Sequence, residues 1–279
     1  MFKCATQLLC FENITLKMNN YPYVCAFYWF TQFLISDIIF CKGWEVFILK
    51  EKIPTILHFN MSLIGGFMGG YAVWNFCELL GNAQTANMIT LVTDIIGRNF
   101  GAVFLRIIGI AVYFSGFAVS VLVKNYTKMN IKLLCLAIDA AAMVTLAIMP
   151  DNLELIIYLY PMFFAMSFQW TVFAGAEGYG SSTIFSTNNL RQFSTSLVEY
   201  ICNRDSEKIK KAKFYGFTLI SFHTGVAIAC IVSLFLGAKS TLIAIAFLVP
   251  AAALVLVQDN PFGIKQESSK VNILQQSKQ

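Results

Sequence analysis

The amino-acid sequence predicts an all-α protein that crosses a membrane several times. Hydrophobic residues make up 57% of the chain and charged residues only 13%, whereas a soluble domain carries roughly 25% charged residues. Apolar runs of about 20 residues, the length that a helix needs to span a bilayer, recur along the sequence. Two polar segments interrupt these runs, one in each half of the chain: residues 81–87 (GNAQTAN) and 185–191 (FSTNNLR). They are named here the first and the second polar island.

Residues 1–53 are predicted to be an appendage to the membrane core. The segment Tyr21–Cys41 is apolar and of spanning length, but it contains Asp37, and no small-residue cleavage site follows it. Two interpretations stay open. This part is either an extra amino-terminal membrane helix or the product of a start assigned too early, with Met18 and Met61 as later starts.

The first membrane repeat is expected over residues 54–149. Its predicted spans are Pro54–Phe76, Phe100–Val123 and Ile131–Met149. The glycines of the first span follow a GxxxG spacing, which lets another helix backbone approach closely; they are Gly65, Gly66, Gly69 and Gly70. After the first polar island, Met88–Gly97 is too short to cross a bilayer and is typical of a half-helix or a re-entrant segment.

The second membrane repeat is expected over residues 150–257. Its predicted spans are Leu155–Ala174, Phe214–Gly237 and Thr241–Val257. Between the first two of them, the second polar island is followed by an amphipathic segment, Leu190–Asn203, which the basic run Glu207–Lys213 is predicted to end. Residues 258–279 are polar and are expected to form a disordered cytoplasmic tail.

The two halves show the same order of span, polar island, short helix, span and span. Each half has three spans, and an odd number inverts the second half relative to the first, as in transporters built from inverted repeats. Basic residues gather at segments that this topology places in the cytoplasm, and the positive-inside rule then puts the carboxyl terminus there as well. These segments are 42–52, 124–132, 191–213 and 265–278.

Several motifs resemble the YoaK family of bacterial inner-membrane proteins. Residues 65–71 (GGFMGGY) and 81–87 are similar to that family's GGYLDAY and ANAQTGN, and residues 165–169 (AMSFQ) and 186–191 are similar to its AMGxQ and CTGNLR. The resemblance covers about residues 58–257. It implies a multi-pass protein of the bacterial inner membrane, and it implies no substrate, because the family is one of unknown function.

The chain departs from the family pattern at four positions. Gly69 stands where Asp is common, Trp170 where Asn is common, and Ala86 and Asn188 replace the glycines of the two TGN motifs. If those residues serve a mechanism in the family, this member is altered or inactive.

The polar islands support two interpretations. In the first, Asn87 and Asn189 are only helix N-caps, with Gln192 completing a capping box after Asn189. In the second, two half-helix amino termini converge near the membrane midplane and bind a neutral polar or anionic solute, so the chain is a transporter or channel. The predicted solute-binding residues are Asn82, Gln84, Thr85, Asn87, Ser186, Thr187, Asn188, Asn189 and Arg191.

Ionisable residues inside the predicted spans are the other candidates for function. Charge within hydrocarbon is costly, so such groups face the bundle interior and often mark ion or proton paths. Asp139 is the predicted proton-coupling residue, and the alternative for it is a structural pair with Arg106 or His223. His223 itself is expected to be a hydrogen-bonded interior residue, and His58 receives no role.

The sequence favours no enzyme, cofactor or metal site. It has no phosphate-binding Gly-rich loop, HExxH or GxSxG motif, and only two His. Its eight Cys show no CxxC spacing. The basic residues lie at the ends of spans, which argues against nucleic acid as a partner. The expected partners are the lipid bilayer and an unidentified small solute, with self-association left open, and the alternative function is that of a non-transporting membrane scaffold or partner subunit.

Overall fold

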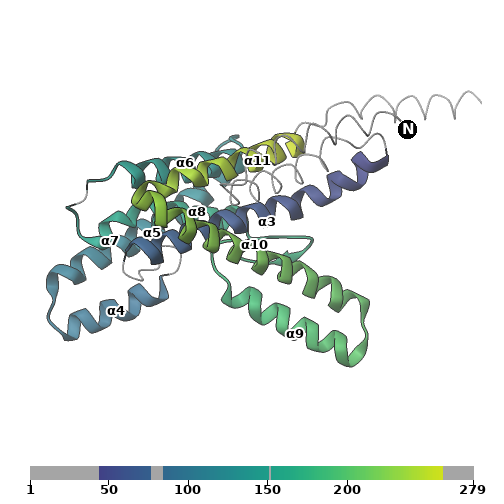
Figure 1. Ribbon diagram of the computed structural model, residues 1–279, viewed down its shortest axis with the longest axis horizontal. Helices are drawn as coiled ribbons and strands as arrows, with labels where there is room; N and C mark the ends of the chain where they lie inside the picture. Colours follow the sequence, from purple (N-terminus) through teal and green to yellow (C-terminus); the bar gives the residue numbers. More distant parts are fainter. Residues whose placement is uncertain (1–43, 77–83, 151, 260–279) are drawn as a thin grey trace, which may run out of the picture. The chain divides into compact units, whose positions relative to one another are not determined.

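A computed structural model describes residues 44–76, 84–150 and 152–259 of this chain (Figure 1). The chain divides into two units, residues 1–52 and 53–279. The predicted amino-terminal helix at 21–41 and almost all of the predicted tail lie outside the described residues. Within the second unit, the described elements are helices and one two-stranded hairpin.

The described part contains four stretches that are long and apolar enough to cross a membrane. They are Lys52–Asn75 in helix α3 (Trp44–Asn75), helix α5 (Phe100–Tyr126), helix α6 (Ile131–Ile148) and Ser206–Asp259. The last stretch contains α10 (Ser206–Leu236), the short 3-10 helix η1 (Gly237–Ser240) and α11 (Thr241–Asp259). The prediction of an all-α membrane protein is therefore confirmed.

The predicted span Leu155–Ala174 is not one helix. It consists of a single turn, α7 (Leu155–Tyr158), and then α8 (Tyr160–Val172), with Pro161 in the first turn of α8. Proline fits the start of a helix because its missing N–H has no partner there in any case. The 13 residues of α8 span roughly 20 Å, less than the hydrocarbon thickness of about 30 Å. Its residues Met162–Phe163 and Ala165–Gln169 are buried within the protein.

Two helical hairpins follow a common plan (Figure 1). The short helix α4 (Thr85–Ile96) turns into α5, and α9 (Thr187–Asn203) turns into α10. In each turn an arginine adopts a left-handed conformation, with φ of 57° at Arg98 and 55° at Arg204. The next residue caps the long helix: the Asn99 side chain accepts from Ala102 N, and the Asp205 side chain accepts from Glu207 N.

The boundaries of these hairpins correct two predictions. The short helix predicted at Met88–Gly97 exists, but it begins at Thr85. The basic run Glu207–Lys213 does not end α9, because it forms the first turns of α10 after the break at Arg204. Asp205 explains the difference: its carboxylate satisfies a free N–H group at the start of a new helix.

Helix α3 packs against α10 at glycine positions on both helices. A Cβ atom at Gly66 would lie 1.9 Å from the carbonyl oxygen of Phe222, and one at Gly225 would lie 2.0 Å from that of Leu63. The two backbones are therefore in direct contact, which only glycine allows. Helix α5 approaches α8 in the same way, since a Cβ at Gly116 would lie 2.5 Å from the carbonyl oxygen of Phe164 and 2.0 Å from Ser167 Oγ. The packing role predicted for the glycines of the first span is confirmed at Gly66.

Candidate functional site

The second polar island follows a buried stretch of backbone that is not helical. After α8, the strands β1 (Gly175–Ala176) and β2 (Tyr179–Gly180) form a minimal hairpin. The chain then returns into the protein as Ser181–Phe185, in which the first four residues are buried, and only afterwards begins α9. Non-helical backbone at membrane depth is tolerated only where protein or a water-filled cavity surrounds it. The segment Ser181–Phe185 is named here the buried strap.

A chain of hydrogen bonds ties the buried strap to α3 and α9. His58 Nε2 lies 2.9 Å from Ser181 Oγ, and that hydroxyl donates to Asn189 Oδ1 at 2.9 Å. A hydroxyl has one hydrogen, so His58 Nε2 is the donor of the first bond. In the neutral imidazole, Nδ1 is then an unprotonated acceptor. Asn189 Nδ2 donates to the carbonyl of Ser182 at 2.7 Å. Asn189 is 1% exposed, and both ends of its amide are used.

Helix α8 holds the other side of the buried strap through Gln169. Its Nε2 donates to the Met61 carbonyl at 3.1 Å and to Thr183 Oγ1 at 2.9 Å. The strap also lies directly against α3, because a Cβ at Gly65 would be 2.1 Å from the Thr183 carbonyl oxygen. Only a glycine at position 65 leaves room for this contact.

Four buried acceptor or hydroxyl atoms on these elements have no hydrogen-bond partner. They are His58 Nδ1, Asn60 Oδ1, Gln169 Oε1 and Ser186 Oγ. Leaving a buried polar group unpaired costs roughly 1–3 kcal/mol. These atoms belong to α3, α8 and the residue that follows the buried strap, and the described part of the protein does not itself satisfy them.

The first polar island is described from Gln84 onward, so Asn82 lies outside the described residues. Asn87 is buried, and it donates to Gln84 Oε1 at 3.3 Å and accepts from Arg106 Nη1 at 3.4 Å. Arg106 Nε makes an ion pair of 2.6 Å with Asp94 Oδ2. The cluster of Asn87, Asp94 and Arg106 therefore joins α4 to α5.

The prediction that Asn87 and Asn189 are N-caps is wrong. The helices begin two residues earlier, at Thr85 and Thr187, and the N-cap residues Gln84 and Ser186 make no side-chain cap bond. Each Asn is the third residue of its helix. Because Asn189 reaches back to the carbonyls of Ser182 and Phe185, its amide fixes the incoming chain and does not satisfy a free helix N–H.

The remaining predicted solute-binding residues are more exposed than the two buried asparagines. Thr85 and Thr187 are exposed, and Arg191 Nη2 donates to Asn188 Oδ1 at 3.1 Å at the surface of α9. Within the described ranges, no hydrogen bond links the first island to the second. Each island instead belongs to its own polar network, one centred on Arg106 and the other on the buried strap.

Asp139 lies fully buried on α6. The Cys135 thiol, 3.8 Å from Oδ2, is its hydrogen-bond partner, and Oδ1 has none. The predicted structural pairs are wrong, because Arg106 pairs with Asp94 and His223 is exposed, with Nδ1 bonded to the Leu219 carbonyl. The expectation of an interior role therefore fails for His223.

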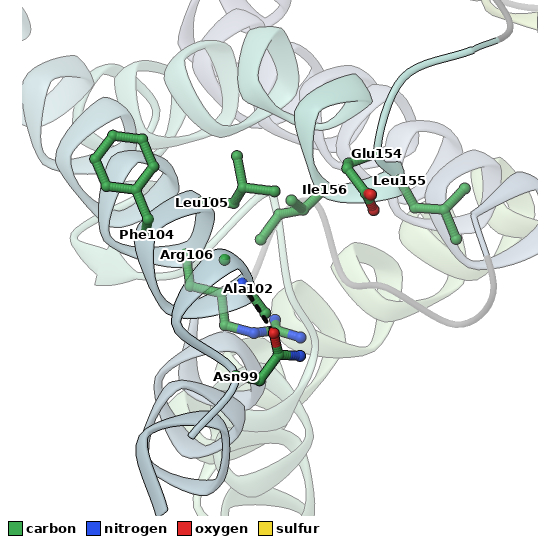
Figure 2. A pocket seen from close by; sticks show the side chains of 9 residues that line it. Asn99, Ala102, Phe104, Leu105, Arg106, Glu154, Leu155 and Ile156 are labelled. Carbon is green, nitrogen blue, oxygen red and sulfur yellow. Dashed lines mark hydrogen bonds between the residues drawn. The ribbon is translucent and has the colours of Figure 1, made fainter. Parts of the chain in front are cut away.

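A cavity of about 700 Å³ opens beside Arg106, between α5 and α7 (Figure 2). Helix α5 supplies one wall with Asn99, Phe104, Leu105 and Arg106. The other wall comes from the start of α7, with Glu154, Leu155 and Ile156. A hydrogen bond of 2.7 Å from Tyr160 Oη to the Leu105 carbonyl fixes α8 against α5 next to this cavity.

The described residues contain no group of three or more His, Cys, Asp or Glu side chains that could hold a metal ion. The sequence does not predict three contributors to the sites: His58, to which it assigns no role, Gln169, which enters only through a family motif, and Glu154. The run of hydroxyl residues Ser181–Thr183, which follows Gly175, Gly178 and Gly180, is the sign in the sequence of a buried polar segment.

The fold and its apolar helices define an integral membrane protein. A family model described as "Protein of unknown function (DUF1275)" matches residues 57–255, and the chain belongs to this family. No curated protein matches the chain, and neither does any solved structure.

Proposed function

We propose that this chain is a transporter or channel for a small polar solute. The observation that carries the proposal is the buried strap: a non-helical segment inside a membrane protein, with unpartnered polar atoms around it. Discontinuous helices of this kind form the substrate and ion sites of transporters, near the midplane of the bilayer. A solute that donates hydrogen bonds would pair with His58 Nδ1 and Gln169 Oε1, which both lack a donor.

The proposal includes two inverted repeats, over residues 54–149 and 150–257. Support comes from the matched hairpins, in which Thr85 and Thr187 begin the short helices and Arg98 and Arg204 adopt the left-handed conformation in the turns. The packing is reciprocal as well: α10 lies against the first helix of the first half, and α5 lies against α8. A pseudo-twofold exchange of the two halves accounts for both contacts.

The membrane location follows from the same proposal. The resemblance to the YoaK proteins supports the bacterial inner membrane, and the distribution of basic residues supports a cytoplasmic carboxyl terminus. The first polar island then approaches the solute path from the outside and the second from the inside. The nine predicted solute-binding residues remain the proposed lining, with Asn189 as a positioning residue because its amide is fully used within the protein.

Asp139 is the proposed proton-coupling group, since a fully buried carboxyl with one weak partner is unusual within a membrane core. Under this proposal Asp139→Asn leaves the fold intact, but solute uptake no longer responds to an imposed pH gradient. Unchanged pH-driven uptake by this variant would remove Asp139 from the mechanism.

The experiment that tests transport uses the full chain in proteoliposomes and three neutral probes: urea, glycerol and erythritol. After a hyperosmotic shock with one probe, light scattering reports how quickly the vesicles re-swell as the probe enters. We expect re-swelling in at least one probe to be faster than in protein-free vesicles, and to slow to the protein-free rate in His58→Leu and Gln169→Leu. His223→Leu is the matched control, because this His is exposed on α10. Equal rates with and without protein for all three probes would argue against the proposal.

A second candidate function is that of a non-transporting scaffold or partner subunit. It is favoured by one observation: the amide of Asn189 is satisfied entirely by Ser181, Ser182 and Phe185. In that case the buried strap only packs α3 against α8. The variants His58→Leu and Gln169→Leu would then lower thermal stability, while no probe would enter the vesicles faster than its leak rate.

A further inference from the structure

We propose that the cavity between α5 and α7 is a binding site for a small zwitterion. Such a molecule carries an ammonium group together with a carboxylate or a phosphate. This site goes beyond the transport proposal, because binding there does not require the chain to move anything across the membrane. It is also built from different residues than those around the buried strap.

Opposite charges lie on the two walls of the cavity. Arg106 projects from α5, and Glu154 is the residue just before α7. Figure 2 shows them on opposite sides of the pocket that both line. No ion pair joins them, since Arg106 binds Asp94. Glu154 has no cationic partner among the ion pairs of the described residues. The separation leaves room for a ligand that presents an anion to Arg106 and an ammonium group to Glu154.

Arg106 is held in place before any ligand arrives. Its Nε is bonded to Asp94 and its Nη1 to Asn87. Its Nη2 has no acceptor in the part of the chain that the structure describes, so this donor is free for an anionic group. A guanidinium fixed by two partners loses little conformational entropy when it binds a third group, which favours binding.

The charge balance favours a zwitterion over a simple anion. The positive charge of Arg106 is already shared with Asp94, and Glu154 adds a second carboxylate. The three groups therefore sum to one negative charge. A ligand with only a carboxylate or phosphate meets net repulsion, whereas an added ammonium group relieves it.

The cavity has room for more than two charged groups. Its volume of about 700 Å³ lies in the range of small-molecule sites, roughly 300–1,000 Å³. Phe104, Leu105, Leu155 and Ile156 give it apolar walls. The ligand therefore combines a zwitterionic group with an apolar body, as a free apolar amino acid does and as an ethanolamine phospholipid does.

The test is equilibrium binding to the purified full chain in detergent. One arm uses radiolabelled L-leucine and the other uses radiolabelled dihexanoylphosphatidylethanolamine, so that a free solute and a lipid headgroup are told apart. We expect at least one zwitterion to bind saturably. Competition by 4-methylpentanoate, which lacks the ammonium group, and by isoamylamine, which lacks the carboxylate, should be roughly tenfold weaker than by the zwitterion, because each analogue loses one charge-assisted hydrogen bond.

The variant Glu154→Gln separates this site from non-specific binding. It should lower the affinity for the zwitterion roughly tenfold. The affinity for 4-methylpentanoate should stay the same or rise, since a repulsive carboxylate is removed. Glu207→Gln is the matched control, an exposed carboxyl that pairs with Lys210 on α10. Both variants should keep the wild-type melting temperature. No saturable binding of either probe, or binding that Glu154→Gln does not weaken, would overturn the proposal.

Discussion

Arg106 Nε lies 2.6 Å from Asp94 Oδ2, and this ion pair connects the short helix α4 to the long helix α5. Both side chains are mostly buried, with 16% and 18% of their surface exposed, whereas Lys208 and Glu199 in the other hairpin are 38% and 47% exposed. Burial decides the strength of such a pair, because exposed pairs contribute about 0–1 kcal/mol and breaking a buried pair costs about 3–5 kcal/mol.

Asp94→Asn should therefore lower the free energy of unfolding by about 2 kcal/mol, between the exposed and the buried limits. Glu199→Gln, in the exposed pair, should cost less than about 0.5 kcal/mol. Unfolding of both variants in mixed micelles, followed by circular dichroism during titration with sodium dodecyl sulfate, measures the difference. Equal losses would mean that the Arg106 pair does not hold α4 to α5.

Glycine packing gives a second prediction. Gly66→Ala places a Cβ 1.9 Å from the Phe222 carbonyl oxygen, so α3 and α10 must separate, and we expect a loss of about 1–3 kcal/mol. Gly101→Ala on α5 meets nothing within 4 Å and should be neutral or stabilising by about 0.4–1 kcal/mol, because alanine favours the helix. The same titration measures both. A stable Gly66→Ala variant would contradict the direct contact of the two backbones.

The parts of the fold that local pattern determines were predicted well. Long apolar runs predict α5, α6 and α11 within a few residues, because length and composition decide whether a helix crosses a bilayer. The predicted span at Leu155–Ala174 failed, because α8 is buried by other helices and so need not match the thickness of the lipid. Composition cannot distinguish an apolar helix in lipid from one inside the protein.

The site was harder to predict than the fold because its partners are distant in sequence. The two polar islands singled out Asn87 and Asn189 as helix caps or solute-binding residues, but the sequence could not show that Asn189 binds Ser181 and Ser182. His58 lies 123 positions from its partner Ser181, and no local pattern relates the two. Similarly, only the folded chain brings Glu154 beside Arg106.

The role of Asn189 as the anchor of the buried strap gives a third prediction. Asn189→Leu leaves the Ser181 hydroxyl without its acceptor and the Ser182 carbonyl without its donor, and this should cost about 2–3 kcal/mol. Asn188→Leu, next to it and partly exposed, should cost less than about 0.5 kcal/mol. If Asn189 were instead a helix cap, Asn189→Ser would restore full stability. Thermal unfolding of the three variants distinguishes these outcomes.

The orientation of the chain gives the fourth prediction. Cys202 is exposed near the end of α9, and Lys239 is exposed in η1, beyond the far end of α10. The 31 residues of α10 extend roughly 45 Å, enough to place these positions on opposite sides of a bilayer.

In a chain whose other cysteines are Ser, a membrane-impermeant maleimide should label Cys202 in inverted vesicles and leave it unlabelled in intact cells. Lys239→Cys, with Cys202 also changed to Ser, should give the reverse pattern. Labelling of Cys202 in intact cells would place the second polar island outside and invert the proposed topology.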